Sequence, residues 1–114
     1  ITGSFVNADA IIRFIKIKNP TVVSLVCMGY SARYPAEEDT FCAEYIRNGI
    51  RGIPFDFQNA LEIIRNTSGK RFFEPANQEF SPIEDFLFCV NLNYFNFVLK
   101  AQPDEEFGMV LRKI

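Results

Sequence analysis

The chain has 114 residues, of which 48% are hydrophobic, and a formal net charge of −2 at pH 7. This composition is that of one globular domain with a core, and not that of a disordered segment. The basic residues are scattered, which argues against a nucleic-acid interface, because such an interface needs clustered Lys and Arg.

Membrane, secretion and zinc signals are also missing from the sequence. No apolar run approaches the length that spans a bilayer, and the first residues lack the basic leader and cleavage site of a signal peptide. The three cysteines have no C-x-x-C spacing and the chain contains no His, which argues against a zinc site. We therefore expect a cytoplasmic protein with reduced thiols. The chain starts without Met in a predicted strand, so we expect an upstream segment.

The first thirty or so residues predict a βαβ unit. Residues 1–6 predict a short strand, and Asn7 is a good N-cap for a helix from Ala8 to about Lys18. Residues 21–28 are a continuous β-branched and apolar run, typical of a strand inside a sheet.

Helices and antiparallel strands are expected in the rest of the chain. Two amphipathic helices are predicted, at about residues 36–48 and 57–66. Residues 81–84, Ser-Pro-Ile-Glu, form a helix start signal, although only a short helical turn is expected there. Strands are expected at 86–90, 95–101 and 107–114, the last two separated by a turn. These elements predict an α/β fold in which a βαβ unit and a mixed sheet are flanked by helices, with antiparallel strands at the C-terminal end.

A βαβ unit would gather polar residues at one edge of the sheet. Ligands bind beyond the carboxyl ends of parallel strands, where the following helices also start. Helix N-termini there present free N–H groups and a positive dipole end, which suit an anion such as phosphate or sulfonate. The residues gathered at this edge would be Ser4, Asn7, Gly29, Ser31, Arg33, Glu38 and Asp39.

These residues also have purely structural explanations. Asn7 can serve only as a helix cap, and the acids at 37–39 stabilise a helix dipole in a first turn without any ligand. The functional interpretation is that Glu38 and Asp39 help to hold Mg²⁺, which prefers oxygen ligands and keeps several waters. Spacing alone does not separate the two.

A second phosphate-binding pattern lies in the loop after residues 21–28. Cys27 and Arg33 fit the C-x5-R spacing of cysteine-dependent phosphatases, in which a thiolate attacks a phosphate held by Arg. Pro35 before the next helix, and Val26 where those enzymes have His, argue against thiolate catalysis. We favour Arg33 as a plain clamp for phosphate or sulfonate.

Four stretches resemble the 2-phosphosulfolactate phosphatase family. Residues 3–8, Gly-Ser-Phe-Val-Asn-Ala, resemble its G-S-F-L-N-A segment, and residues 25–29 resemble its L-V-C-A-G strand end. Residues 38–43, Glu-Asp-Thr-Phe-Cys-Ala, resemble its E-D-T-L-C-A helix start. Glu84-Asp85 with Phe88-Cys89 resembles the E-D-x-x-F-C that precedes its final strands. The order and approximate spacing match over nearly the whole chain.

The resemblance implies an enzyme that hydrolyses a phosphate monoester with Mg²⁺. In methanogens the family removes phosphate from 2-phospho-3-sulfolactate on the way to coenzyme M. It further implies that residues 1–114 are a C-terminal domain or fragment, half of a three-layer α/β/α enzyme. The family's V-L-R-A-T-like and T-T-T-N-G-T-like segments would lie in a missing N-terminal half, so we expect the fragment alone to be inactive.

The resemblance also carries expectations for individual residues. Ala36 stands where the family has a Ser N-cap, and two family Asp positions within residues 91–96 are Asn here, so another phosphorylated small acid fits as substrate equally well. The alternative is a non-catalytic domain that binds an anion or forms a homodimer. In the enzyme interpretation, Glu38 and Asp39 handle the metal and water, and the contacts to the phosphorylated, possibly sulfonated, substrate come from Ser4, Asn7, Gly29 and Arg33.

Overall fold

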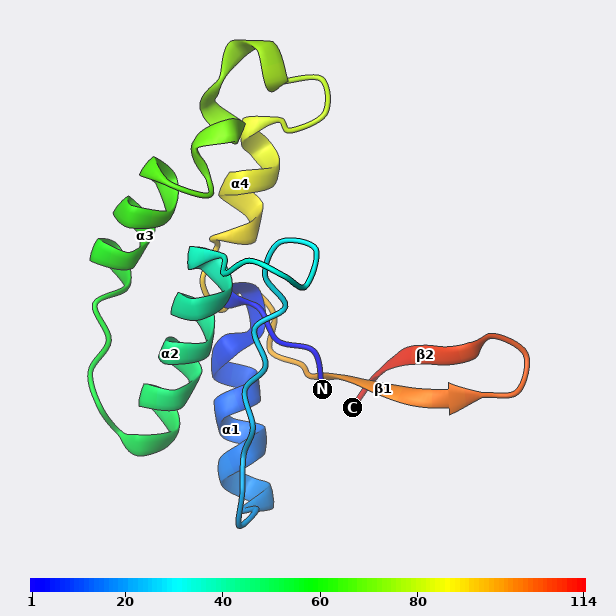
Figure 1. Cartoon of the computed structure of the whole chain (residues 1–114). Helices are drawn as coiled ribbons and strands as arrows, with labels where there is room; N and C mark the ends of the chain where they lie inside the picture. The colour runs from blue at the N-terminus through cyan, green and yellow to red at the C-terminus, as the bar shows by residue number, and fades with distance from the viewer.

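The computed structural model describes all 114 residues as four helices followed by a hairpin (Figure 1). Short 3₁₀ turns lie at Phe5–Asn7, Lys70–Phe73 and Pro75–Asn77. None of the helices has the length and apolar character needed to cross a membrane. The helices are α1 (Ala8–Lys18), α2 (Glu37–Arg51), α3 (Phe57–Asn66) and α4 (Ile83–Cys89), and the strands are β1 (Leu99–Asp104) and β2 (Gly108–Lys113).

The main core lies between α1 and α2, which run side by side (Figure 1). Ile11, Ile12 and Ile15 of α1 are buried in the same cluster as Ile46 of α2. The two helices approach closely at Gly49, where a Cβ atom would collide with Ile12. Apolar spacing at i, i+3 and i+4 therefore places one face of α1 against α2, as the sequence predicts.

A second, smaller core joins the N-terminal turn to α3 and α4. It consists of Phe5, Ile64 and Phe86, all buried, with half-buried aromatic side chains around them. Phe5 packs edge-on against Phe57 at the start of α3, with ring centroids 5.3 Å apart. This contact fixes the N-terminal segment beside the helices, and it decides where residues 3 and 4 lie.

Most helix predictions are confirmed. The bounds of α1 and α3 match those expected, and α2 continues three residues past the expected end, to Arg51. It ends at Gly52, which adopts a left-handed conformation with φ of 70°. The strand predicted at residues 86–90 is wrong, because the start signal at residues 81–84 opens a full helix, α4, and Phe86 enters the second core from it.

The expected βαβ unit is also wrong for these 114 residues. The sheet contains only β1 and β2, which pair antiparallel as predicted. The expected bounds of the first strand, 95–101, are wrong, because β1 begins at Leu99 and continues through residues 102–104, where the turn was expected. Residues 1–6 bond instead to the C-terminal part of the chain, with Thr2 N–H donating to Leu99 O at 3.0 Å and Phe95 N–H donating to Val6 O at 2.7 Å. Residues 21–28 follow an extended path in Figure 1, but they form no backbone hydrogen bond and so have no partner strand.

Candidate functional site

Residues expected at one crevice do meet, in a small cavity of about 230 Å³. It lies where the N-terminal segment, the start of α2, the turn after α3 and the end of α4 come together. Three residues singled out from the sequence line it: Ser4, Glu38 and Asp39. The complete lining is Gly3, Ser4, Phe5, Glu38, Asp39, Cys42, Ile64, Ser68, Gly69, Arg71, Phe72, Phe86, Cys89 and Val90.

The route to this convergence differs from the expected one. No pair of parallel strands aligns the two segments. The burial of Phe5 between α3 and α4 holds Ser4 close to the first turn of α2. Ser4 itself caps the short turn that follows, its N–H donating to Asn7 Oδ1 at 3.1 Å.

Asp39 connects the cavity to the loop before α2. Its Oδ2 accepts a hydrogen bond from the Gly29 N–H at 2.6 Å. Gly29 has φ of 65°, and a Cβ atom there would collide with the carbonyl oxygen of Tyr34, so only glycine fits this position without a shift. Gly29 therefore contributes to the site through Asp39, and it does not itself line the cavity.

Two polar side-chain atoms in the cavity wall have no hydrogen-bond partner. Glu38 Oε2 and Ser68 Oγ are both buried and unpaired, and no other buried side-chain polar atom of the chain shares this state. A buried carboxylate oxygen without a partner loses its hydration and gains nothing in exchange. Such an atom is expected where a cation or a hydrogen-bonding ligand completes the structure.

The first turn of α2 also offers unused donors. Its N-cap is Ala36, which supplies no side-chain hydrogen bond, in agreement with the loss of the usual Ser. The backbone N–H groups of Glu37, Glu38 and Asp39 have no acceptor in the structure. They add positive potential to a turn that carries three carboxylates.

Asn7 and Arg33 lie outside this cavity. Asn7 is 5% exposed, and its side-chain amide accepts from Ser4 and donates to Phe97 O at 3.4 Å. Arg33 is exposed in a tight turn in which its N–H donates to Tyr30 O at 2.9 Å. The structure thus brings Ser4, Glu38, Asp39 and, through Asp39, Gly29 together, but neither Asn7 nor Arg33.

Sequence reasoning missed Ser68 and Arg71 as lining residues. Arg71 stacks its guanidinium over the Phe72 ring, 4.9 Å from the centroid, and 6.0 Å from that of Tyr30. It is the positively charged residue among those that line the cavity. One signal was available, because Lys70-Arg71 is one of two adjacent basic pairs in the chain.

The thiols beside the site are not arranged for nucleophilic attack. Cys27 is exposed, and its thiol donates to the backbone carbonyl of Asp39 at 3.5 Å. Burial, followed by the charges of Asp39 and Cys27, raises the pKa of Cys42 to about 12. Cys42 is therefore a neutral thiol at physiological pH.

The carboxylates present suit a metal that takes few protein ligands. No group of three or more His, Cys, Asp or Glu side chains is placed to hold a metal ion by itself. Glu38 and Asp39 supply two carboxylates, of which Glu38 has a free buried oxygen. Mg²⁺ commonly binds through one or two carboxylates together with water and substrate phosphate, so these residues fit part of such a site.

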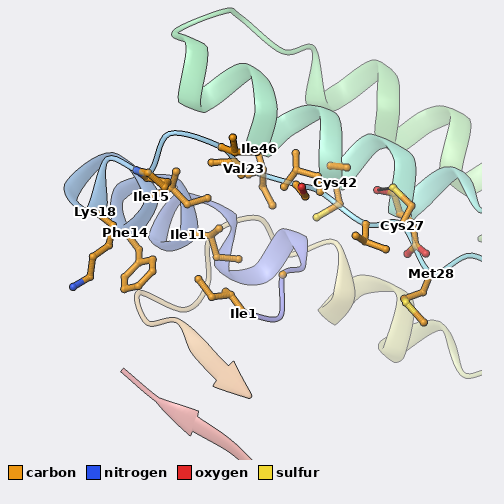
Figure 2. A pocket seen from close by; sticks show the side chains of 18 residues that line it. Ile1, Ile11, Phe14, Ile15, Lys18, Val23, Cys27, Met28, Cys42 and Ile46 are labelled. Atoms are coloured by element: carbon orange, nitrogen blue, oxygen red, sulfur yellow. Dashed lines mark hydrogen bonds between the residues drawn. The ribbon is translucent and has the colours of Figure 1, made fainter. Parts of the chain in front are cut away.

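A second, larger cavity of about 570 Å³ separates residues 22–28 from α1 and α2. Figure 2 shows its walls, with Ile11, Phe14 and Ile15 coming from α1, and Cys42 and Ile46 from α2. Thirteen of its 18 lining residues are hydrophobic, and Lys18 and Asp39 are the charged ones. This space lacks the polar groups that phosphate chemistry requires, so the smaller cavity is the candidate site.

The comparison with protein families agrees with the sequence resemblance. A sequence model of 2-phosphosulpholactate phosphatase matches residues 1–104. The chain belongs to this family. The part of the chain that matches the 2-phosphosulpholactate phosphatase family includes every residue that lines the small cavity.

A curated relative is about twice as long as this chain. The chain is 30% identical over 118 residues to the "Probable 2-phosphosulfolactate phosphatase" of Bacillus subtilis (strain 168). That alignment covers all of this chain and 49% of the relative, so the chain spans about half the length of the curated relative that it matches. No solved structure matches the chain.

Proposed function

We propose that the full-length protein is a Mg²⁺-dependent phosphatase of a small phosphorylated hydroxy acid, resembling 2-phosphosulfolactate. The observation that carries this proposal is the convergence of Ser4, Glu38 and Asp39 on one cavity in a chain of the 2-phosphosulpholactate phosphatase family. These 114 residues supply one wall of the active site, and the rest of the protein supplies the other.

The charges of the cavity support a role for a cation. A phosphate dianion close to Glu38 and Asp39 would be repelled unless a divalent ion neutralised the carboxylates. Mg²⁺, when bound, supplies that neutralisation and polarises the phosphoryl group. Glu38 would hold the ion through its unpaired Oε2, and Asp39 through the oxygen that does not accept from Gly29.

The remaining lining residues are suited to orienting an anion. Arg71 offers a charge-assisted contact to phosphate or sulfonate oxygens, while Ser4 and Ser68 offer hydroxyl donors. The backbone N–H groups of Glu38 and Asp39, which both line the cavity, have no acceptor within the chain. Catalysis would consist mainly of positioning and charge neutralisation, as is usual in phosphoryl transfer.

Phosphate release by the full-length protein tests this function. We expect release from 2-phosphosulfolactate in the presence of Mg²⁺, loss of activity with EDTA, and recovery when Mg²⁺ is added back. The isolated residues 1–114 should show no significant turnover, since they correspond to only 49% of the matched relative. Absence of Mg²⁺-dependent release from this and from other phosphorylated hydroxy acids would contradict the proposal.

A further inference from the structure

The segment Thr21–Met28 has the sequence of a strand but no partner. It is an uninterrupted run of uncharged, mostly apolar residues without proline. Its backbone follows an extended path in Figure 1. None of its eight backbone N–H groups or eight carbonyl groups takes part in a hydrogen bond within the chain. Backbone groups in such an apolar stretch are almost always paired in a native protein.

Side chains alternate along this segment as they do in a strand. Val23, Leu25 and Cys27 line a shallow groove together with residues of α2, and Val23 and Leu25 are 39% and 37% exposed there. On the opposite face, Val22 and Val26 are 76% and 80% exposed. One set of side chains is thus only partly shielded by α2, and the other presents β-branched apolar side chains to solvent.

The chain as a whole has too much surface for a protein of its mass. Its accessible surface is 8080 Å², whereas a monomeric protein of 13.1 kDa is expected to expose about 6,400 Å². Its radius of gyration is 15.4 Å, against about 13 Å expected for a domain of this length. This excess of roughly 1,700 Å² on one partner corresponds to about 3,400 Å² over both partners, which is the size of a large, permanent interface.

We propose that Thr21–Met28 is an internal strand whose neighbours come from the part of the family protein outside these 114 residues. The matched relative is about twice as long as this chain, so a region of similar size is available to supply them. An internal strand needs a partner at each edge, with about four N–H groups directed to either side. It also needs cover for the face that carries Val22 and Val26.

A second copy of this chain would pair fewer of the backbone groups of Thr21–Met28 and would leave its exposed face uncovered. Two copies of Thr21–Met28 paired with each other leave one edge of each strand open and the outer face uncovered. The hairpin β1–β2 is in the same situation, because it projects from the helices in Figure 1 as an isolated pair, which is marginally stable in water. A large region of the same polypeptide covers both features.

Hydrogen–deuterium exchange of the full-length protein tests the pairing directly. We expect the amides of Val22 to Met28 to exchange at least about 100-fold more slowly than those of an unstructured peptide. Exchange at the rate of the free peptide would overturn the proposal. So would an open reading frame that encodes these 114 residues and nothing else.

Two lysine substitutions test whether the face that carries Val26 is covered in the full-length protein. Val26 and Ile17 are both 80% exposed in this chain, and Ile17 lies between Lys16 and Lys18 on the solvated side of α1. In the full-length protein, V26K is expected to lower the melting temperature by about 10 °C or more, because it buries a charge. The matched I17K is expected to shift it by less than about 2 °C. Equal shifts for the two variants would overturn the proposal.

A photo-crosslink identifies what covers the segment. With benzoylphenylalanine at position 26 of the full-length protein, the crosslink should form within one polypeptide, to residues outside the 114. A crosslink between the Thr21–Met28 segments of two copies would instead assign the surface to a homodimer and overturn the proposal. This readout, like amide exchange of the unsubstituted protein, does not depend on whether V26K folds.

Discussion

The backbone N–H of Gly29 donates a 2.6 Å hydrogen bond to Oδ2 of Asp39, ten residues further along the chain. The bond ties the end of the unpaired segment to the first turn of α2, at the wall of the small cavity. One carboxylate oxygen therefore fixes the loop, while the other remains available to a ligand.

Two substitutions at Asp39 separate these roles. D39N keeps an acceptor for the Gly29 amide but removes the charge, whereas D39A removes both. Under the proposed function, we expect both variants of the full-length protein to lose phosphatase activity by about 100-fold or more, because the proposed Mg²⁺ would lose a carboxylate. Only D39A should accelerate exchange of the Gly29 amide. A D39N protein of normal activity would reduce Asp39 to a structural residue.

Substitution of Glu38 is expected to lower activity without lowering the stability of the folded protein. Its Oε2 is buried without a partner, so E38Q removes an uncompensated charge and should leave the free energy of unfolding unchanged or slightly raised. Activity should fall by about 100-fold or more under the proposed function. Urea unfolding and phosphate release, measured on the same preparation, check the two effects.

Glu37 provides the matched control for Glu38. It carries the same charge in the same helical turn but does not line the cavity. E37Q should therefore cost only a few tenths of a kcal/mol, from the lost interaction with the helix dipole. Its kcat and KM should stay unchanged. If E37Q and E38Q reduced activity equally, a general effect of the α2 N-terminus would be indicated.

Under the proposed function, Arg71 and Arg33 are the two candidates for the residue that binds the substrate anion. Arg71 lines the cavity and Arg33 does not, so we expect R71M to raise KM about tenfold or more through loss of a charge-assisted contact. R33M should change KM by less than about twofold. Steady-state kinetics on the two variants decide between them. The reverse result would assign the anion to the Tyr30–Tyr34 turn.

Sequence reasoning located helices better than strands, and the reason is physical. The apolar stripes of α1 and α3 are local signals that are satisfied by packing on a neighbouring helix, which is α2 in both cases, and the bounds of the two helices match those predicted. The strand signal of residues 21–28 is just as strong, but a strand needs a partner to form a sheet. Nothing within these 114 residues provides that partner.

The candidate site was predicted in part for a different reason. Helix starts are visible in sequence, so Glu38 and Asp39 could be placed at the first turn of α2. Arg71 reaches the same cavity only through the second core, in which Phe72 and Phe73 pack around Phe86. Such a long-range contact leaves no periodic signal, and the exposed turn at Arg33 looked equally suitable.

Gly69 is expected to be critical for that second core. Its φ of −81° suits any residue, but a Cβ atom there would lie 2.5 Å from a carbon of the Phe86 ring and 2.8 Å from the Ile64 carbonyl oxygen. G69A should therefore lower the free energy of unfolding by about 1–3 kcal/mol. S68A, at the neighbouring position, should have almost no effect, since it removes only an unpaired hydroxyl. Urea denaturation checks both, and equal effects would mean that the core accommodates the extra methyl group.

The buried thiol of Cys42 is expected to make the free energy of unfolding decrease at alkaline pH. Burial, and then the charges of Asp39 and Cys27, raise the pKa of its thiol from 9.0 to about 12 in the folded protein. Between these two values the unfolded chain has lost a proton that the folded chain retains. The contribution of the thiol is therefore fully present below pH 9 and is lost as the pH rises toward 12.

We expect the free energy of unfolding of the full-length protein to fall above pH 9 with a Cys42 contribution of up to about 1.4 kcal/mol per pH unit. C42A removes the titrating group, so its stability should decline less steeply over pH 9–10.5, although the small cavity that it leaves lowers stability at every pH. C89A is the control, because it removes an exposed thiol of the same chain. Urea unfolding at several pH values gives the three slopes. If C42A and the unsubstituted protein had the same slope, the alkaline loss would have to come from other groups and the thiol would not be as strongly buried as its position beside Asp39 implies.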